Sequence, residues 1–237
     1  IGNRMICPGP STSPSGCSPI LTGHKPSAPT GEFKIHSNYL RYGWRGLTFF
    51  AGCNEAYPAQ IIGNDIAGAG TLGIWLHSTV DCVLIANNTI VGNGILNAAS
   101  PASGAHGLYI GKPDTTAVQI TNNIFYGNYR GYFFTGTFGT TSSHNDYYGQ
   151  VSWNIDSGSS QSLEASALTV DPKFINVATS DHRLDGPSTL RRAGVAVTEC
   201  IDLNHVHCTS TPDIGAYQAH HGGKPTGTLS PNAAGVR

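Results

Sequence analysis

The chain has 237 residues, a formal net charge of −1 at pH 7 and only 11% charged residues. So neutral a balance argues against a nucleic-acid partner, which requires a basic surface, and no apolar run is long enough for membrane insertion. The 30 glycines and 14 prolines leave little room for helices and favour an all-β fold.

A short phrase recurs along the chain and defines a repeat. The stretches CVLIANNTIVGNG at 82–94 and AVQITNNIFYGN at 117–128 both place an Ile three residues before an Asn and an apolar residue two after it. This spacing recurs at Asn38, Asn64, Asn88 and Asn123, with weaker copies at Asn3 and Asn145. Each copy predicts two short strands joined by a turn that carries the Asn.

A second phrase follows each copy after a loop of variable length. It alternates with a period of two and predicts a third strand, in GLTF at 46–49, GIWL at 73–76, GLYI at 107–110 and GYFF at 131–134. Short strands that cannot bury their faces alone must stack. The sequence therefore predicts a right-handed parallel β-helix, a solenoid in which each repeat is one coil.

The repeated Asn is predicted to be structural rather than catalytic. Its amide would bond to the backbone and to the Asn of the next coil, which forms an Asn ladder. Asn also tolerates the left-handed conformation that we expect in so tight a turn. Because an unsatisfied buried amide costs about 1–3 kcal/mol, a gap in the ladder would be expensive.

Six cysteines are present, and none belongs to a CxxC pair. The pairing that closes the most local loops is Cys7 with Cys17, Cys53 with Cys82, and Cys200 with Cys208. Disulfides would indicate a secreted or cell-surface protein, whereas six buried thiols in a cytosolic protein are the alternative.

The coils resemble those of right-handed parallel β-helix proteins, including pectate-lyase-like polysaccharide enzymes. The stretches DPKFIN at 171–176, DHRLDGPSTLRRAG at 181–194 and PDIGAYQ at 212–218 resemble the closing motifs of secreted bacterial β-helix proteins with a choice-of-anchor C-terminal region. Gln218 stands where that family usually has an acid, and GPSTLRRAG departs from its middle motif. The resemblance implies the fold and a bacterial, exported protein.

We expect coils over residues 1–178, a C-terminal closing region over 179–218 and a flexible tail over 219–237. The chain begins with Ile inside a coil, without a signal peptide or a capping segment, and is expected to be a processed product or a fragment that is truncated or uncapped at this end. An uncapped end would be covered by the loop CPGPSTSPSGCSP, by earlier coils or by another chain.

The outward positions of the third strand are the first candidate site. By alternation one column consists of Thr48, Trp75, Tyr109 and Phe133. Exposed aromatic rings usually mark binding, and flat rings suit sugars. The alternative is a loop that folds over the column and buries it.

Charged groups are expected to border this column. Arg45, His106 and Arg130 precede the third-strand glycines in one register, and the following loops carry Glu55, Asp81 and Asp114. The predicted substrate-binding residues are Trp75, Tyr109, Phe133, His106, Glu55, Asp81 and Asp114.

The outward strand positions contain no pair of carboxylates, so hydrolysis of the usual glycosidase type is not favoured. A lyase instead needs a base and a cation beside a uronate carboxylate. The candidate catalytic residues are His77, Arg45, Arg130 and Tyr109, and His77 is the natural proton carrier near neutral pH. No cofactor is required, although Ca²⁺ could serve as the cation. The histidines at 205–207 and 220–221 are interpreted as surface residues rather than a metal site.

Two functions of different classes remain open. One is a carbohydrate-active protein that binds an acidic or neutral polysaccharide along the third strands and cleaves it as a lyase. The other is a non-catalytic structural or adhesive module that contacts another chain through its ends or its aromatic face.

Overall fold

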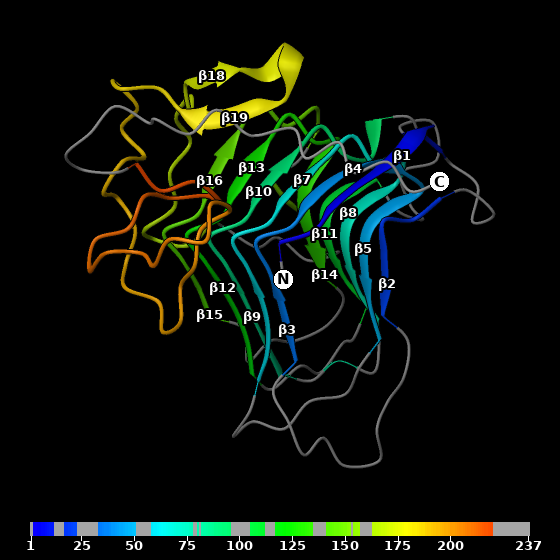
Figure 1. Ribbon diagram of the computed structural model, residues 1–237, viewed down its shortest axis with the longest axis horizontal. Coiled ribbons are helices and arrows are strands. Elements are labelled where there is room, and N and C mark those ends of the chain that lie inside the picture. The colour runs from blue at the N-terminus through cyan, green and yellow to red at the C-terminus, as the bar shows by residue number, and fades with distance from the viewer. Residues whose placement is uncertain are drawn as a thin grey trace.

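The computed structural model describes residues 2–11, 17–22, 33–50, 58–77, 80, 82–95, 105–111, 117–134, 141–152, 154–156 and 163–219. The strands form three parallel sheets, A, B and C, and the chain passes from A to B to C before it returns to A (Figure 1). This arrangement confirms the predicted all-β parallel β-helix, in which each circuit is one coil.

Each sheet collects one strand from every coil. Sheet A contains β1 (Arg4–Pro10), β4 (Tyr39–Gly43), β7 (Asp65–Ala67), β10 (Thr89–Val91), β13 (Ile124–Tyr126) and β16 (Asp146–Tyr148). Sheet B contains β2 (Ile20–Thr22), β5 (Arg45–Phe49), β8 (Leu72–Leu76), β11 (His106–Ile110), β14 (Arg130–Phe134) and β17 (Ile155–Asp156). Sheet C contains β3 (Lys34–His36), β6 (Ala59–Ile62), β9 (Cys82–Ala86), β12 (Ala117–Thr121) and β15 (Thr141–Ser143).

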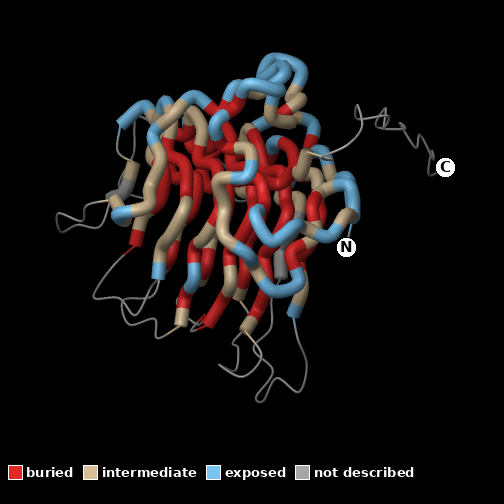
Figure 2. Tube along the Cα trace, turned by 90° about the vertical axis from the view of Figure 1, so that its left-hand side faces the viewer, coloured by how far each residue is buried: buried red, intermediate tan, exposed pale blue. Residues whose placement is uncertain are grey.

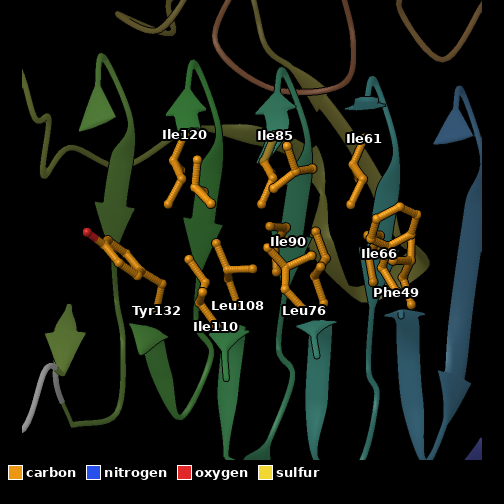
Figure 3. Packing of buried hydrophobic residues seen from close by; sticks show 14 of the residues in the cluster. Phe49, Ile61, Ile66, Leu76, Ile85, Ile90, Leu108, Ile110, Ile120 and Tyr132 are labelled. Atoms are coloured by element: carbon orange, nitrogen blue, oxygen red, sulfur yellow. The ribbon is translucent and has the colours of Figure 1, made fainter. Parts of the chain in front are cut away.

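Apolar residues of successive coils pair in columns that fill the inside of the helix. In sheet C, Ile35 pairs with Ile61, and Ile61 pairs with Ile85. In sheet B the predicted inward residues are all buried, namely Leu47, Phe49, Ile74, Leu76, Leu108, Ile110, Tyr132 and Phe134. Figure 3 shows these columns between the sheets, and Figure 2 shows that burial is concentrated in the strands.

The repeated asparagines form a continuous hydrogen-bonded row, the first ladder, at the corner between sheets C and A. The backbone N–H and Nδ2 of Asn88 both donate to Oδ1 of Asn123, at 3.0 and 2.9 Å. The row consists of Asn3, Asn38, Asn64, Asn88, Asn123, Asn145 and finally the carboxylate of Glu164. The interpretation of the repeat as structural is confirmed.

The left-handed conformation belongs to a different residue from the one predicted. The residue immediately before each ladder Asn has a φ between 50° and 70°, and these residues are Gly2, Ser37, Gly63, Asn87, Asn122 and His144. The ladder asparagines are not among the residues with positive φ. The tight turn is thus made one position earlier, and the ladder Asn supplies hydrogen bonds only.

A second ladder, which the sequence reading missed, lies at the corner between sheets A and B. The backbone N–H of Ala69 donates to Oδ1 of Asn93, Asn93 donates to Asn128, and the N–H of Asn128 donates to Oε1 of Gln150. Each member follows a glycine with a φ between 57° and 72°. The signal was the Gly-Asn pair that ends both copies of the phrase at 82–94 and 117–128.

The C-terminal end of the stack is covered by residues 163–170. Leu168 pairs with Asp146 at the edge of sheet A, and the N–H of Leu168 donates to the carbonyl of Asn145 at 2.8 Å. Leu163 and Ala167 pack on the main core. The opposite ends of the sheets are β1, β2 and β3. The N-terminal loop expected to cover that end includes residues 12–16, which lie outside the described residues.

The C-terminal region packs along the side of the stack. It contains the hairpin of β18 (Phe174–Asn176), the 3₁₀ helix η3 (Val177–Thr179) and β19 (Asp181–Leu184), and it lies against the outer face of sheet A (Figure 1). The backbone of Gly215 donates to the carbonyl of Asn122, and Oγ of Ser37 donates to the carbonyl of Asp202. The sequence motifs of this region therefore hold it to sheet A and to the corner of the first ladder.

The cysteine pairing is confirmed for Cys7–Cys17 and Cys200–Cys208. Cys82 is also disulfide-bonded, but Cys53 lies outside the described residues, so its pairing with Cys82 stays a prediction. No helix within the described ranges is long and apolar enough to cross a membrane.

Replacing Asn88 with Leu should lower the free energy of unfolding by about 2–4 kcal/mol. The change removes the acceptor of both donors of Asn64 and both bonds that Nδ2 makes, to Asn123 and to the carbonyl of Ile61. Urea unfolding measures the effect, and Gln119→Leu on the exposed side of β12 is the control. Equal unfolding midpoints for the two variants would contradict the ladder's role.

Candidate functional site

The outer face of sheet B carries the predicted aromatic column in one register. Trp75 pairs with Tyr109, and Tyr109 pairs with Phe133, so the three rings come from β8, β11 and β14. All three residues are partly buried, whereas Thr48, the fourth member predicted, is fully buried. We call Trp75, Tyr109 and Phe133 the aromatic strip.

Arg45 is held between two tryptophan rings at one end of the strip. Its Cζ lies 3.5 Å from the ring centroid of Trp44 and 3.6 Å from that of Trp75. Two rings so close to one atom must cover opposite faces of the guanidinium. Burial lowers the pKa of Arg45 to about 10, which keeps it protonated at neutral pH. The geometry therefore favours Arg45 as a fixed cation rather than a base.

His77 belongs to the same group of rings. It follows β8 and lies 4.7 Å from Phe50 and 5.3 Å from Trp75, measured between ring centroids. Phe50 also contacts Trp75 edge to face at 5.3 Å. His77 is partly buried, so it remains the imidazole nearest to the strip with access to solvent. The sequence reading missed Trp44 and the contacts of Phe50, because Trp44 lies in the corner before β5.

The other end of the strip is formed by Tyr109 and Phe133. Their rings stack at 5.0 Å with an interplanar angle of 22°. Because the two residues are register neighbours on adjacent strands, the stacked faces are turned toward each other along the helix axis. A ligand would therefore meet ring edges here, and not the flat faces that were expected.

His106 is not part of a basic rim. It is 1% exposed, lies 4.9 Å from the ring of Phe133, and has its Nε2 3.4 Å from a guanidinium nitrogen of Arg130. Burial and the charge of Arg130 lower the pKa of His106 to about 3, so it is neutral at neutral pH. The register of the residues that precede the third-strand glycines places it correctly beside the strip, but the rings of Tyr109 and Phe133 contact it and it is buried. Arg130 remains partly exposed at this end of the strip.

The predicted acidic rim cannot be placed. Glu55, Asp81 and Asp114 all lie outside the described residues. The strands β5, β8, β11 and β14 contain no Asp or Glu. In the part of the chain that the structure describes, no group of three or more His, Cys, Asp and Glu side chains could hold a metal ion. That no cofactor is required, and that Ca²⁺ could serve as the cation, both stay predictions.

A buried charge cluster under the C-terminal region resembles catalytic machinery but cannot meet a substrate. The carboxylate of Asp65 contacts Arg41 at 2.7 Å, His182 at 2.9 Å and the hydroxyl of Tyr217 at 2.7 Å. Burial alone would raise the pKa of Asp65, but the charges of Arg41 and His182 lower it to about 2. The exposed fraction of Asp65 is 0%. His182 and Tyr217 thus anchor two C-terminal motifs to sheet A, which is a structural role.

Asp146 is a second buried carboxyl on the outer side of sheet A. Its Oδ1 accepts a hydrogen bond from the N–H of Val170 at 3.0 Å, while its buried Oδ2 has no hydrogen-bond partner among the described residues. Burial, opposed by the hydrogen bond from Val170 and assisted by the charge of Asp171, raises the pKa of Asp146 to about 7. Residues 168–170 cover this carboxyl, which removes it from any substrate.

The fold and the strip define a parallel β-helix with an aromatic and cationic outer face. The chain matches no protein family, no curated protein and no solved structure. The function is therefore inferred from the geometry of this face.

The buried carboxyl of Asp146 should make the stability of the fold depend on pH. Its pKa in the unfolded chain is about 4, so folding disfavours the ionised form, and stability should fall as the pH rises from about 4 to about 7. Asp146→Asn should be more stable than the wild type by about 2–4 kcal/mol at pH 8 and should differ little at pH 4. Urea unfolding of both proteins from pH 4 to pH 8 measures this difference. A constant difference across that range would contradict a buried titrating carboxyl.

Proposed function

We propose that this protein is a secreted carbohydrate-active β-helix protein that binds a polysaccharide along the aromatic strip. The observation that carries the proposal is the register of Trp75, Tyr109 and Phe133 on one outer face, with Arg45 and Arg130 beside them. Adjacent strands lie about 4.8 Å apart, close to the rise of one sugar in an extended chain. A glycan parallel to the helix axis would meet a new side chain at each sugar.

The position of the C-terminal region supports sheet B as the binding face. The C-terminal region packs on the outer side of sheet A, where Ile124, Leu190 and Ile214 form a second core cluster. The described contacts of that region reach sheet A, the corner of the first ladder and Lys34 on β3 of sheet C, not the aromatic strip. Sheet B thus keeps partly exposed rings, and such rings usually mark binding.

Export and a pectate-lyase-like relationship belong to the same proposal. The disulfides Cys7–Cys17 and Cys200–Cys208 suit an oxidising, extracellular environment. The resemblance of the C-terminal motifs to those of secreted bacterial β-helix proteins agrees with this location.

The reaction that best suits the strip is β-elimination from a uronate. The described strands of sheet B lack the two carboxylates that glycoside hydrolysis requires. A lyase needs a proton acceptor and a cation, and His77 lies beside the ring that stacks on Arg45. His77 would take the proton alpha to the carboxylate, while Arg45 and Arg130 would balance its charge. Tyr109 is the remaining candidate for proton transfer.

A structural or adhesive module is the second candidate, and the N-terminal end of the stack favours it. There β1, β2 and β3 end the three sheets, and Ile6 and Phe33 are 51% and 40% exposed. Among the described residues no strand pairs with the outer edges of β1, β2 and β3, and such edges beside apolar side chains suit pairing with another chain. This use of the end is independent of the aromatic strip.

Trp75→Ala and Tyr109→Ala should each weaken polysaccharide binding about tenfold, or about 1.4 kcal/mol, since each removes apolar ring area that a bound glycan would cover. Calorimetric titration against a panel of neutral and acidic polysaccharides measures the loss. Tyr42→Ala is the matched control, because Tyr42 is a 39% exposed aromatic residue on sheet A.

His77→Ala separates binding from cleavage in the same panel. It should retain binding and abolish the rise in ultraviolet absorbance that an unsaturated uronate produces. If no polysaccharide binds the wild type better than Trp75→Ala, the strip is not a glycan site and the structural module is the better reading.

A further inference from the structure

Arg45 and Arg41 are stacked in similar ways, but only one of them has an acid. The guanidinium of Arg41 lies 3.6 Å from the ring of Tyr39 and donates to Oδ2 of Asp65 at 2.7 Å. Arg45 lies between Trp44 and Trp75. In the part of the chain that the structure describes, no hydrogen bond or ion pair is made by Arg45, and its buried Nε has no partner.

The stacking determines which atoms of Arg45 a ligand can reach. The rings of Trp44 and Trp75 occupy both faces of the planar guanidinium, which leaves only its edge for hydrogen bonds. That edge presents N–H donors in a fixed fork that fits two oxygens of one carboxylate or sulfate. The rings also fix the position of the fork before a ligand arrives, so little side-chain freedom is lost on binding.

A partly buried cation without a counter-ion is unfavourable unless something else provides the anion. The carboxylate of Asp65 is the counter-ion of Arg41. For Arg45 the neighbouring strands β2, β5 and β8 contain no carboxylate, and the one acidic residue in the strands of sheet B, Asp156, lies on β17, four strands further along. Among the described residues no acid pairs with Arg45, so a ligand on the outer face of sheet B is a suitable source of oxyanion.

We propose that Arg45, clamped by Trp44 and Trp75, is a subsite for a carboxylate or sulfate group, so that the ligand of the strip is an acidic polysaccharide. This rests on the proposed function of the strip and narrows its ligand class. Arg130 stands three strands further along the same register, about 14 Å away at the usual strand spacing. A polymer with an acidic group on every sugar would reach both arginines.

The test uses polymers that differ only in charge. Polygalacturonate and its fully methyl-esterified form make one pair, and dextran sulfate and dextran make the other. Trp44 and Trp75 are two of only three tryptophans in the chain, so intrinsic fluorescence reports directly on the subsite. The wild type should bind at least one charged polymer at least tenfold more tightly than its neutral counterpart, and the preferred pair identifies carboxylate or sulfate.

Three variants test whether the guanidinium geometry of Arg45 is required for binding. Arg45→Gln should lose about tenfold to a hundredfold in affinity for the charged polymer, and Arg45→Lys should lose most of that as well, since an ammonium keeps the charge but not the bidentate geometry. Both variants should lose clearly more affinity for the charged polymer than for its neutral counterpart. Arg4→Gln removes the same charge from the exposed end of β1 on sheet A and should leave all affinities unchanged. Thermal unfolding checks that each variant is folded.

The outcomes separate this inference from the proposed function. If charged and neutral polymers bind equally and Trp75→Ala weakens both, the strip binds glycan but the anion subsite is wrong. If Arg4→Gln weakens binding as much as Arg45→Gln, the attraction is general charge and the subsite is again wrong. If no polymer binds, the proposed function and the subsite both fail.

Discussion

The fold depends on one directional hydrogen-bonded row. Each Asn of the first ladder donates two hydrogen bonds to the Oδ1 of the next, so every Oδ1 accepts from its neighbour on the N-terminal side. The Nδ2 group also donates back to a carbonyl of the preceding coil, as from Asn88 to Ile61. Glu164 ends the row with a carboxylate, which only accepts. An Asn at this place would bring further donors that need acceptors. The ladder thus explains both the repeat and the residue at which it stops.

Only the corner of the first ladder has a constant length, because each strand of sheet A begins three residues after the preceding strand of sheet C ends. Successive members of the first ladder are 24 residues apart at Asn64 and Asn88 but 35 apart at Asn88 and Asn123. Most of this difference lies between β10 and β11, where the chain passes from sheet A to sheet B, and the segments between sheets B and C also vary in length. Loop variation is therefore concentrated beside sheet B, the sheet that carries the aromatic strip. A rigid frame with variable loops beside one face is a common arrangement for a binding site.

Sequence patterns could predict the columns and the ladder because each depends on local spacing. Ile61, Ile85 and Trp75 all lie on the side of the strand that the period of two assigns to them. Burial of outward residues could not be predicted, because it depends on neighbours from other coils and on the C-terminal region. His106 is outward yet covered by Phe133, and Asp65 is outward yet covered by His182 and Tyr217. The stacking of Arg45 between Trp44 and Trp75 involves two adjacent coils, so it could not be predicted from local spacing either.

A charged side chain that pairs with another charge of the chain has a structural role. A fixed charged side chain that lacks such a partner is a candidate for ligand binding. Arg41 and Asp65 are fully buried and paired, and removing either would leave an uncompensated charge inside the protein. Their pairing is complete without a ligand, so they explain only how the C-terminal region is held. Arg45 has the same kind of stacking, but no acid within the described ranges pairs with it, and it lies on the face that the C-terminal region leaves uncovered. An arginine fixed in position without its counter-ion is better explained by an anion that arrives from solution than by the stability of the fold.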